Sequence, residues 1–352
     1  MYNGTSLFSN VGIDEHFFKT RNVKIKVANE LLDKRAMFYK HLYPDVDVII
    51  GDIRNDIVFK TIINKHVKYK CDFLIATPPC QGMSVAGKMD KNDERNALIK
   101  YVVKFIQITK PKNILIENVP GLLKFKIEVN GEKVAIKDYI INTLECMGYI
   151  VNYGVLDAAD YETPQHRKRA IFLISNIRKW EFPKPKNRIT VKDVIYNLES
   201  IESGEKGKHR FHYAKKHNKK HILWMSNTPT GKSAHDNLEH FPIKDNGEKI
   251  KGYKTTYKRI DWDKPAPTIT MANGSISSQN NVHPGRIKKD KTYSDARVLT
   301  ILELLRLTGL PDDWNIPIWA TDNLIREVIG ESFPPKFALS MLSTMPNEYE
   351  DE

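Results

Sequence analysis

Short apolar runs alternate with helix-like stretches through the first half of the chain, and this alternation limits the possible folds more than any other feature. Short strands that are separated by helices are typical of a parallel sheet with helices on both faces. We therefore expect an α/β fold built on a doubly wound, mostly parallel sheet. The predicted strands are residues 6–11, 23–28, 46–50, 72–76, 113–116, 149–156 and 170–174, and the predicted helices are residues 31–42, 97–108 and 137–147.

Residues of chemical interest collect at the ends of these predicted strands. Gly12, Glu30, Asp52, Cys80 and Glu117 each end or follow an apolar run. In open α/β sheets, ligands bind at the carboxyl ends of the strands. The sequence therefore predicts a binding or catalytic site along this edge of the sheet.

The pattern changes at about residue 178, where prolines, lysines and scattered aromatic residues replace the alternation. Between Arg178 and Arg259 there are 20 Lys and Arg residues against nine Asp and Glu, in a chain whose formal net charge is +12. A basic segment of this kind indicates a domain that faces a polyanion. A lysine-rich surface that only aids solubility is the alternative.

The same change of pattern divides the chain into expected domains. After the basic segment, residues 297–310 are predicted to be helical, and a further helix is predicted after Pro335. The last part is expected to be a hinge helix and a segment that returns to the first domain. The predicted domains are residues 1–177, 178–295 and 296–352.

The three cysteines, Cys71, Cys80 and Cys146, are too few and too widely spaced for a disulfide framework or a zinc site. Cys80 stands out because it follows a predicted strand and two prolines, which fix the direction of the chain as it leaves the strand. A thiol is soft and partly ionised near neutral pH, so it is suited to add to an electron-poor ring. An inert cysteine in an ordinary loop is the alternative.

Five short motifs resemble, in their order and spacing, those of the DNA (cytosine-5) methyltransferase family. The likeness runs from Leu7 to Ala338, apart from most of residues 178–260. It implies the fold of S-adenosyl-methionine-dependent methyltransferases, with a smaller, irregular and basic target-recognition domain, and methyl transfer to carbon 5 of cytosine. The motifs are Pro79-Cys80-Gln81, Glu117-Asn118-Val119, Gln165-His166-Arg167-Lys168-Arg169, the helical stretch that begins with Arg297-Val298-Leu299-Thr300, and Gly330-Glu331-Ser332-Phe333-Pro334-Pro335.

The resemblance implies a role for each catalytic residue. Cys80 is expected to add to carbon 6 of the ring, and Glu117, in its protonated form, to donate to ring nitrogen 3. Arg167 is expected to contact the cytosine carbonyl, while Arg169 holds the site or the backbone. Because the two arginines are two residues apart at a predicted strand start, we expect them to share a face. Without Cys80 and Glu117, a surface ion pair would be the preferred interpretation of these arginines.

The implied cofactor is S-adenosyl-methionine. Phe8 and Gly12 match the family's first motif, Glu30 is placed to hold the ribose hydroxyls, and Asp52 is placed to accept from the adenine amine, although a carboxylate there also fits a helix cap. Further cofactor contacts are expected from Ile53, Pro79, Leu98 and Ser332. The chain departs from the family at Asn10 and Ile13, where glycines are usual, and at Glu331, where asparagine is usual.

Double-stranded DNA is the expected partner, and no metal is expected. A cytosine inside a duplex presents neither face of its ring, so it has to be flipped out of the helix. The resemblance places DNA contacts at Gln81, Ser84, Thr268 and Thr270. An RNA cytosine methyltransferase on the same scaffold is the main alternative, but the long basic segment favours duplex DNA. The intact catalytic residues argue against a non-enzymatic relative that only binds DNA.

Location and context are also predicted. The sequence contains neither an apolar run of membrane-spanning length nor a signal-peptide pattern, so we expect a soluble monomer that acts on the nucleoid in the cytoplasm, not at a membrane. The compact length suggests a bacterial or phage enzyme. We expect it to protect host DNA in a restriction-modification system, with a cognate restriction endonuclease encoded alongside.

Overall fold

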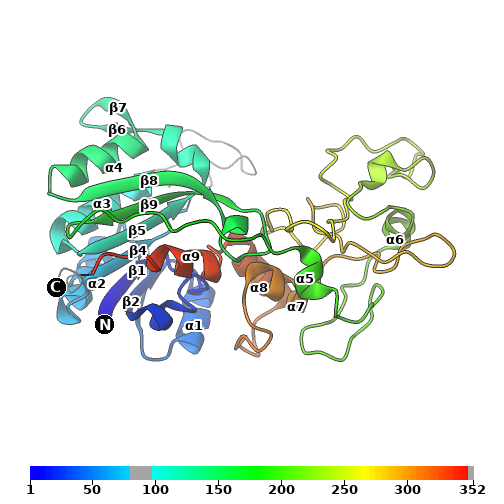
Figure 1. Ribbon diagram of the computed structural model, residues 1–352, viewed down its shortest axis with the longest axis horizontal. Coiled ribbons are helices and arrows are strands. Elements are labelled where there is room, and N and C mark those ends of the chain that lie inside the picture. The colour runs from blue at the N-terminus through cyan, green and yellow to red at the C-terminus, as the bar shows by residue number, and fades with distance from the viewer. Residues whose placement is uncertain (80–96, 348–352) are drawn as a thin grey trace. The chain divides into compact units, whose positions relative to one another are not determined.

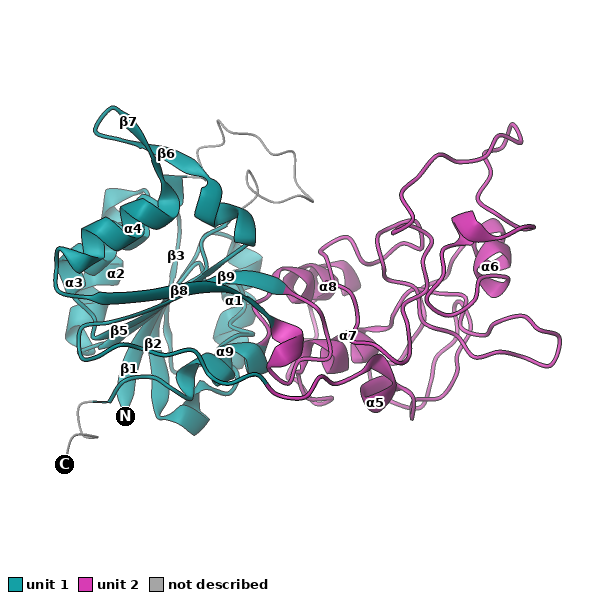
Figure 2. Ribbon diagram, turned by 45° about the horizontal axis from the view of Figure 1, so that its top comes forward, with its two compact units in different colours: residues 1–157, 168–185, 335–352 teal, residues 158–167, 186–334 magenta. Residues whose placement is uncertain are grey.

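The computed structural model describes residues 1–79 and 97–347 and divides into two compact units (Figure 2). Unit 1 comprises residues 1–157, 168–185 and 335–352, and unit 2 comprises residues 158–167 and 186–334. The predicted recognition domain, 178–295, therefore covers most of unit 2, which also includes residues 158–167 and 296–334. No helix within the described residues is both long and apolar enough to cross a membrane.

Unit 1 contains a seven-stranded sheet in the order β3-β2-β1-β4-β5-β9-β8. All neighbouring strands pair in parallel from β3 to β5, whereas β9 runs antiparallel to both β5 and β8. This arrangement confirms the predicted doubly wound, mostly parallel sheet. The strands are β1 (Tyr2–Leu7), β2 (Val23–Glu30), β3 (Asp47–Ile50), β4 (Phe73–Ala76), β5 (Asn113–Asn118), β8 (Ile150–Asp157) and β9 (Lys168–Ser175).

Helices cover both faces of this sheet (Figure 1). Apolar side chains of α2, α3 and α4 form one continuous core with the central strands. Figure 1 shows α1 and α9 on the other face. The helices of unit 1 are α1 (Asp33–Leu42), α2 (Asp56–Lys68), α3 (Leu98–Thr109), α4 (Ile136–Glu145) and α9 (Pro335–Leu342), together with the short 3-10 helices η1 (Phe18–Arg21) and η3 (Pro120–Lys124).

Three differences from the predicted elements have local causes. The first strand ends at Leu7 and not at residue 11, because Phe8 and Asn10 adopt left-handed backbone angles. Helix α2 was not predicted, although the side chain of Asn55 caps it by accepting from the amides of Ile57 and Val58. The hairpin of β6 (Lys126–Val129) and β7 (Glu132–Ala135) was also missed, although its turn has the sequence Asn-Gly.

Unit 2 contains little regular secondary structure, in agreement with the loss of periodicity in the sequence. The predicted helix at 297–310 is α7 (Ile301–Thr308), which begins at a capping box of Thr300 and Glu303 and ends at Gly309. An apolar core surrounds Trp224 and Tyr257. The other helices of unit 2 are α5 (Val191–Ile195), α6 (Lys219–Ser226) and α8 (Asp322–Glu331), with the 3-10 helices η4 (Ala158–Asp160) and η5 (Ala234–Asp236).

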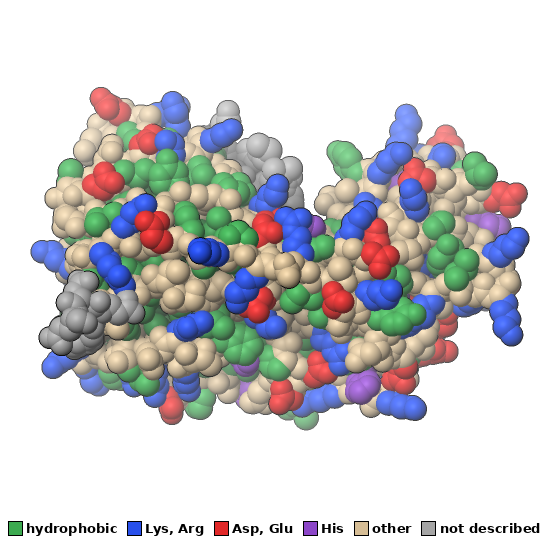
Figure 3. Space-filling view, viewed as in Figure 1, with side chains coloured by type: hydrophobic (Ala, Val, Ile, Leu, Met, Phe, Trp, Pro, Cys, Tyr) green, Lys and Arg blue, Asp and Glu red, His purple; other side chains and the backbone are tan. Residues whose placement is uncertain are grey.

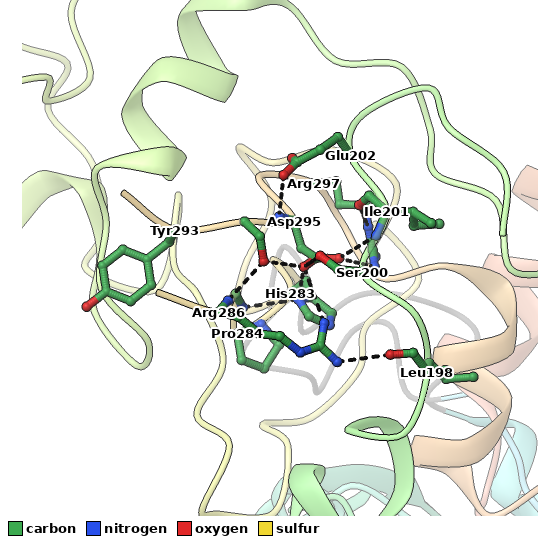
Figure 4. Close-up of polar contacts among 12 residues, drawn as sticks. Leu198, Ser200, Ile201, Glu202, His283, Pro284, Arg286, Tyr293, Asp295 and Arg297 are labelled. Atoms are coloured by element: carbon green, nitrogen blue, oxygen red, sulfur yellow. Dashed lines mark hydrogen bonds and ion pairs between the residues drawn. The ribbon is translucent and has the colours of Figure 1, made fainter. Parts of the chain in front are cut away.

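A buried charge cluster joins the irregular segments of unit 2 (Figure 4). Arg297 is fully buried, and its guanidinium contacts Asp295 at 2.8 Å and both oxygens of Glu303 at 2.8 and 2.9 Å. Asp295 in turn accepts from the hydroxyl of Ser200 at 2.6 Å and from the amide of Ile201 at 3.1 Å. The cluster therefore ties residues 200–201, 295–297 and helix α7 together without a sheet.

His283 lies inside this cluster in its neutral form. Its Nδ1 accepts from the amide of Gly285 at 3.0 Å, which requires that this nitrogen carry no proton. Burial lowers the pKa of His283 to about 4, against the opposing effect of Asp295 and Glu303. Burial alone would raise the pKa of Glu303, but the guanidinium of Arg297 lowers it to about 2.

These shifts predict that the protein loses stability as the pH falls. An unfolded histidine binds a proton below about pH 6.5, whereas folded His283 stays neutral down to about pH 4, so the unfolded state binds more protons in this window. The loss from His283 alone should reach about 3 kcal/mol between these pH values. Below about pH 4.3, protonation of Glu303 in the unfolded state should add to this loss of stability. Denaturant unfolding followed by tryptophan fluorescence at pH 7, 6, 5 and 4 measures this dependence.

The variant His283→Asn keeps an acceptor for the Gly285 amide but cannot titrate. It should flatten the dependence of the unfolding free energy on pH between about 6.5 and 4. The exposed His240 of the same unit provides the matched control, since His240→Asn should leave the dependence unchanged. If the unfolding free energy of His283→Asn falls with pH as steeply as that of the wild type, the proposed role of His283 is wrong.

Candidate active site

The loop that follows β1 is shaped by left-handed residues and by two tyrosines of the α1 region. Phe8, Asn10 and Gly12 have φ values of 59°, 48° and 72°. The hydroxyl of Tyr43 donates to the carbonyl of Gly12 at 2.6 Å. A Cβ atom on Gly12 would lie 2.7 Å from the rings of both Tyr39 and Tyr43, so this position has room only for glycine.

Asn10 departs from the glycine that is usual in the family's first motif, yet it fits this loop. Asparagine is one of the few residues that adopt left-handed angles readily. The amide of Asn10 donates to Oε2 of Glu30 at 2.9 Å. Ile13, the second departure, is buried in the apolar core.

Glu30 ends β2 and connects two backbone turns. Its Oε1 accepts from the amide of Leu32 at 2.9 Å, while its Oε2 accepts from Asn10. Burial raises the pKa of its carboxyl group, and the backbone hydrogen bonds act in the opposite direction. The two backbone hydrogen bonds thus hold the carboxylate in one orientation at the strand end.

Asp52 lies two residues beyond β3, and in the structure its carboxylate is paired with Arg54. The Nε of Arg54 is 2.9 Å and the Nη2 is 2.7 Å from Oδ2 of Asp52, and this pairing lowers the pKa of the carboxyl group. Arg54 was not among the residues predicted from the sequence. Ile53 is buried and packs with Leu7 in the core of the sheet.

Side-chain amides connect the ends of neighbouring strands. The Nδ2 of Asn29, in β2, donates to the carbonyls of Ile49 and Gly51 at 3.0 and 3.1 Å, which fixes the exit from β3. The Nδ2 of Asn118, in β5, donates to the carbonyl of Pro78 at 2.8 Å, which fixes the exit from β4. The two asparagines hold the segments that carry Asp52 and Pro79.

The segment after β4 leads to the predicted nucleophile. The hydroxyl of Thr77 donates to the carbonyl of Phe8 at 3.1 Å, so the exits of β1 and β4 are also joined. Cys80, Gln81 and Ser84 lie outside the described residues. Leu98 begins α3 and is buried in the core of unit 1.

Glu117 and Arg169 form a nearly buried ion pair at the end of β5. The Nε of Arg169 lies 2.6 Å from Oε1 of Glu117, with side-chain exposures of 12% for the arginine and 10% for the glutamate. The pairing follows from the strand register. Glu117 lies opposite Ile171 in the antiparallel pair of β5 and β9, and Arg169 is on the same face as Ile171 because it is two residues away.

Two further carboxyl groups, those of Asp14 and Glu15, are buried in unit 1, and neither was predicted from the sequence. Burial, followed by the negative charges of Glu15 and Glu117, raises the pKa of Asp14 well above its usual value. Burial also raises the pKa of Glu15 to about 7, although the hydroxyl of Tyr39 donates to its carboxylate. The available sequence signal was a pair of consecutive acidic residues directly after the apolar Ile13.

Arg167 has different surroundings from Arg169. Strand β9 begins at Lys168, so Arg167 directly precedes the strand, and Arg167 belongs to unit 2 whereas Arg169 belongs to unit 1. Arg167 is buried, and its guanidinium donates to the carbonyls of Ile269 and Gly330 at 3.0 and 3.1 Å.

The remaining predicted residues of unit 2 make contacts to the backbone. The hydroxyl of Thr268 donates to the carbonyl of His166 at 2.7 Å, and the carbonyl of Thr270 accepts from Asn273 at 2.7 Å. Ser332 is buried at the end of α8, and its hydroxyl donates to the carbonyl of Ile329 at 2.8 Å.

Comparison with known proteins identifies the family. The chain matches the family described as C-5 cytosine-specific DNA methylase over residues 2–347. It is 49% identical over 351 residues to the type II methyltransferase M1.HgaI of Avibacterium volantium, covering 98% of each chain. It is 29% identical over 308 residues to the type II methyltransferase M1.HphI of Haemophilus parahaemolyticus, covering 85% of this chain and 74% of that one.

Solved structures agree in fold. A prophage-encoded E. coli protein described as a DNA modification methyltransferase superposes with a TM-score of 0.71 at 20% identity, covering 98% of both chains. The methyltransferase EhMeth of Entamoeba histolytica superposes with a TM-score of 0.65 at 16% identity, covering 97% of both chains. The extent of the family match and the similarity to M1.HgaI show that this chain belongs to the C-5 cytosine-specific DNA methylase family.

Proposed function

We propose that this chain methylates carbon 5 of a flipped-out cytosine in duplex DNA through a covalent adduct with Cys80. The observation that carries the proposal is the Glu117–Arg169 pair at the end of β5, next to a β4 exit that Asn118 holds in place. A nucleophile that follows Pro79 and a carboxyl group on the neighbouring strand are the two groups that this chemistry needs. Family membership supports the same reaction.

The residues at the ends of β1, β2 and β3 fit S-adenosyl-methionine. When bound, this cofactor supplies the electrophilic methyl group. At Gly12 the loop has no room for a Cβ atom, so only backbone lies there. The carboxylate of Glu30, which two backbone amides hold in place, is suited to accept from the hydroxyls of a ribose. Asp52 suits an adenine amine, and this contact requires that Asp52 accept a donor besides Arg54.

Glu117 and Arg169 divide the recognition of the base between them. Glu117 would donate a proton toward ring nitrogen 3 and accept from the exocyclic amine. We assign the contact with the cytosine carbonyl to Arg169, whereas the sequence motif had pointed to Arg167. Arg169 already lies beside Glu117, while the guanidinium of Arg167 is engaged by two backbone carbonyls.

We propose the following steps for Cys80. The Cys80 thiolate would form a bond to carbon 6 while the electrons of the carbon 5–carbon 6 double bond shift toward ring nitrogen 3. Carbon 5 would then bond to the methyl group as the bond between that group and the cofactor sulfur breaks, with the electron pair staying on sulfur. A base then removes the proton from carbon 5, and the electron pair of that bond expels the thiolate. Thiolate release restores the aromatic ring and frees the enzyme.

Unit 2 is the proposed DNA-holding part, with Thr268 and Thr270 beside the flipped nucleotide. On the face seen in Figure 3, its lysines and arginines are interspersed with acidic side chains. Within residues 206–220, Lys215 is paired with Asp322 at 3.1 Å and Lys220 with Asp245 at 2.5 Å. Lys208, Lys216 and Lys219 are exposed and are better candidates for phosphate contacts.

The names of the relatives point to the biological context. M1.HgaI and M1.HphI are both described as type II methyltransferases. We propose that this chain has the same place in a restriction-modification system, acting as a monomer in the cytoplasm and protecting DNA from a cognate endonuclease.

The proposed function makes a prediction about the nucleophile. Cys80→Ser should abolish methyl transfer but leave duplex binding within about twofold, because serine lacks the ionised, soft sulfur. Transfer of a labelled methyl group to duplex DNA and to transfer RNA, with binding measured in parallel, provides the readout. Turnover by the serine variant at the wild-type rate would overturn the covalent mechanism, and preference for transfer RNA would overturn the proposed substrate.

A second prediction concerns the exposed lysines. The triple variant Lys208→Gln, Lys216→Gln, Lys219→Gln should weaken DNA binding and reduce the slope of log K against log salt by up to about 0.9 for each phosphate that is no longer neutralised. The matched control is the triple variant Lys34→Gln, Lys60→Gln, Lys133→Gln, which removes the same charge from exposed positions of unit 1. Equal slopes for both triple variants would exclude this segment from the DNA interface.

A further inference from the structure

The stretch from Pro164 to Arg167 pairs with a segment of unit 2 about 100 residues away. The amide of His166 donates to the carbonyl of Ala266 at 2.7 Å, and the amide of Ala266 donates to the carbonyl of Pro164 at 2.9 Å. We call residues 266–271 the clamped segment. It contains Thr268 and Thr270, to which DNA contacts were assigned.

Side chains extend this pairing on both sides. The Oε1 of Gln165 accepts from the amide of Ile269 at 3.1 Å, and the hydroxyl of Thr268 donates to the carbonyl of His166 at 2.7 Å. The Nε2 of Gln165 also lies 3.4 Å from the carbonyl oxygen of Leu307 in α7. The clamped segment is thus tied to the 164–167 stretch through Ala266, Thr268 and Ile269.

Arg167 adds a connection to a third part of the chain. Its Nη1 donates to the carbonyl of Ile269 at 3.0 Å, and its Nη2 donates to the carbonyl of Gly330 at 3.1 Å. Gly330 lies in the last turn of α8, 163 residues from Arg167. The planar guanidinium therefore bridges the clamped segment and the end of α8 with two donors of fixed geometry.

Gly330 makes this close contact possible. A Cβ atom on Gly330 would lie 2.3 Å from the carbonyl oxygen of Thr270 and 2.6 Å from the amide nitrogen of Met271. The backbone of the clamped segment therefore lies directly against α8, where no other residue fits. Asn273 strengthens the same contact, since its Nδ2 donates to the carbonyls of Thr270 and Arg326, at 2.7 and 3.1 Å.

We infer that Arg167 is a positioning residue, which holds the clamped segment against α8, and not a catalytic residue that touches the base. The effect on methylation rests on the proposed function, because it assumes that Thr268 and Thr270 hold the DNA beside the flipped nucleotide. The clamp itself rests only on contacts within unit 2. Lysine at this position keeps the charge but cannot reach two carbonyls with a planar pair of donors.

The kinetic test compares two arginines of one motif. Arg167→Lys should raise KM for duplex DNA by at least about fivefold, with a smaller change in kcat, because a loosened segment weakens the grip on DNA. Arg169→Lys should give the opposite pattern, a fall in kcat of about a hundredfold or more with little change in KM. If Arg167→Lys lowers kcat and leaves KM unchanged, the positioning role is wrong.

Hydrogen exchange in the absence of DNA tests the clamp independently of activity. The amides of Ile269 to Met271 should exchange at least about tenfold faster in Arg167→Lys than in the wild type, and Arg169→Lys should leave them unchanged. Gly330→Ala attacks the same contact from the opposite side and should give the same increase.

This second variant also decides the case in which Arg167→Lys does not fold. Unchanged exchange in either folded variant would overturn the clamp. If the amides exchange faster in the variants, but the wild-type protein methylates neither duplex DNA nor transfer RNA, the clamp is supported and the proposed function is refuted.

Discussion

The hydrogen bond from Asn118 to the carbonyl of Pro78 determines where the chain leaves β4, and the proposed chemistry depends on that exit. Parallel strands end at one edge of a sheet, but the directions of the segments that follow are not set by the sheet itself. At the exit of β3, the side chain of Asn29 fixes the direction of the chain by donating to two backbone carbonyls. Each such bond contributes only about 1 kcal/mol net, yet leaving its buried partner unsatisfied costs about 1–3 kcal/mol.

In unit 2, irregular segments are held in place without a sheet. Arg297, Asp295 and Glu303 connect these segments through charge-assisted hydrogen bonds. Buried ion pairs are weak evidence for stability as such, but removal of one partner typically costs about 3–5 kcal/mol. The cluster therefore specifies one arrangement of these segments of unit 2 and makes unit 2 sensitive to acid.

Much of this organisation could be predicted from the sequence, since strand periodicity and short motifs are local signals. The sheet, the positions of Glu30 and Glu117 at or near strand ends, and a helix within residues 297–310 were all predictable in this way. Helix α2 and the β6–β7 hairpin also have local signals, which are the N-cap Asn55 and the turn Asn130-Gly131.

The roles of Arg167 and Arg169 could not be separated from the sequence. Their spacing is compatible with one shared face, and the difference depends on where β9 begins. It also depends on carbonyls at Ile269 and Gly330, which are 102 and 163 residues away. The assignment of residues 158–167 to unit 2 could not be predicted for the same reason, because this stretch pairs with residues about 100 or more positions away.

The central claim is that the methyl group is placed on carbon 5 of cytosine. Nucleosides from duplex DNA that has been incubated with the protein and isotopically labelled S-adenosyl-methionine can be separated and identified by mass spectrometry. We expect the label in 5-methyldeoxycytidine. Label in N4-methyldeoxycytidine or N6-methyldeoxyadenosine would contradict it.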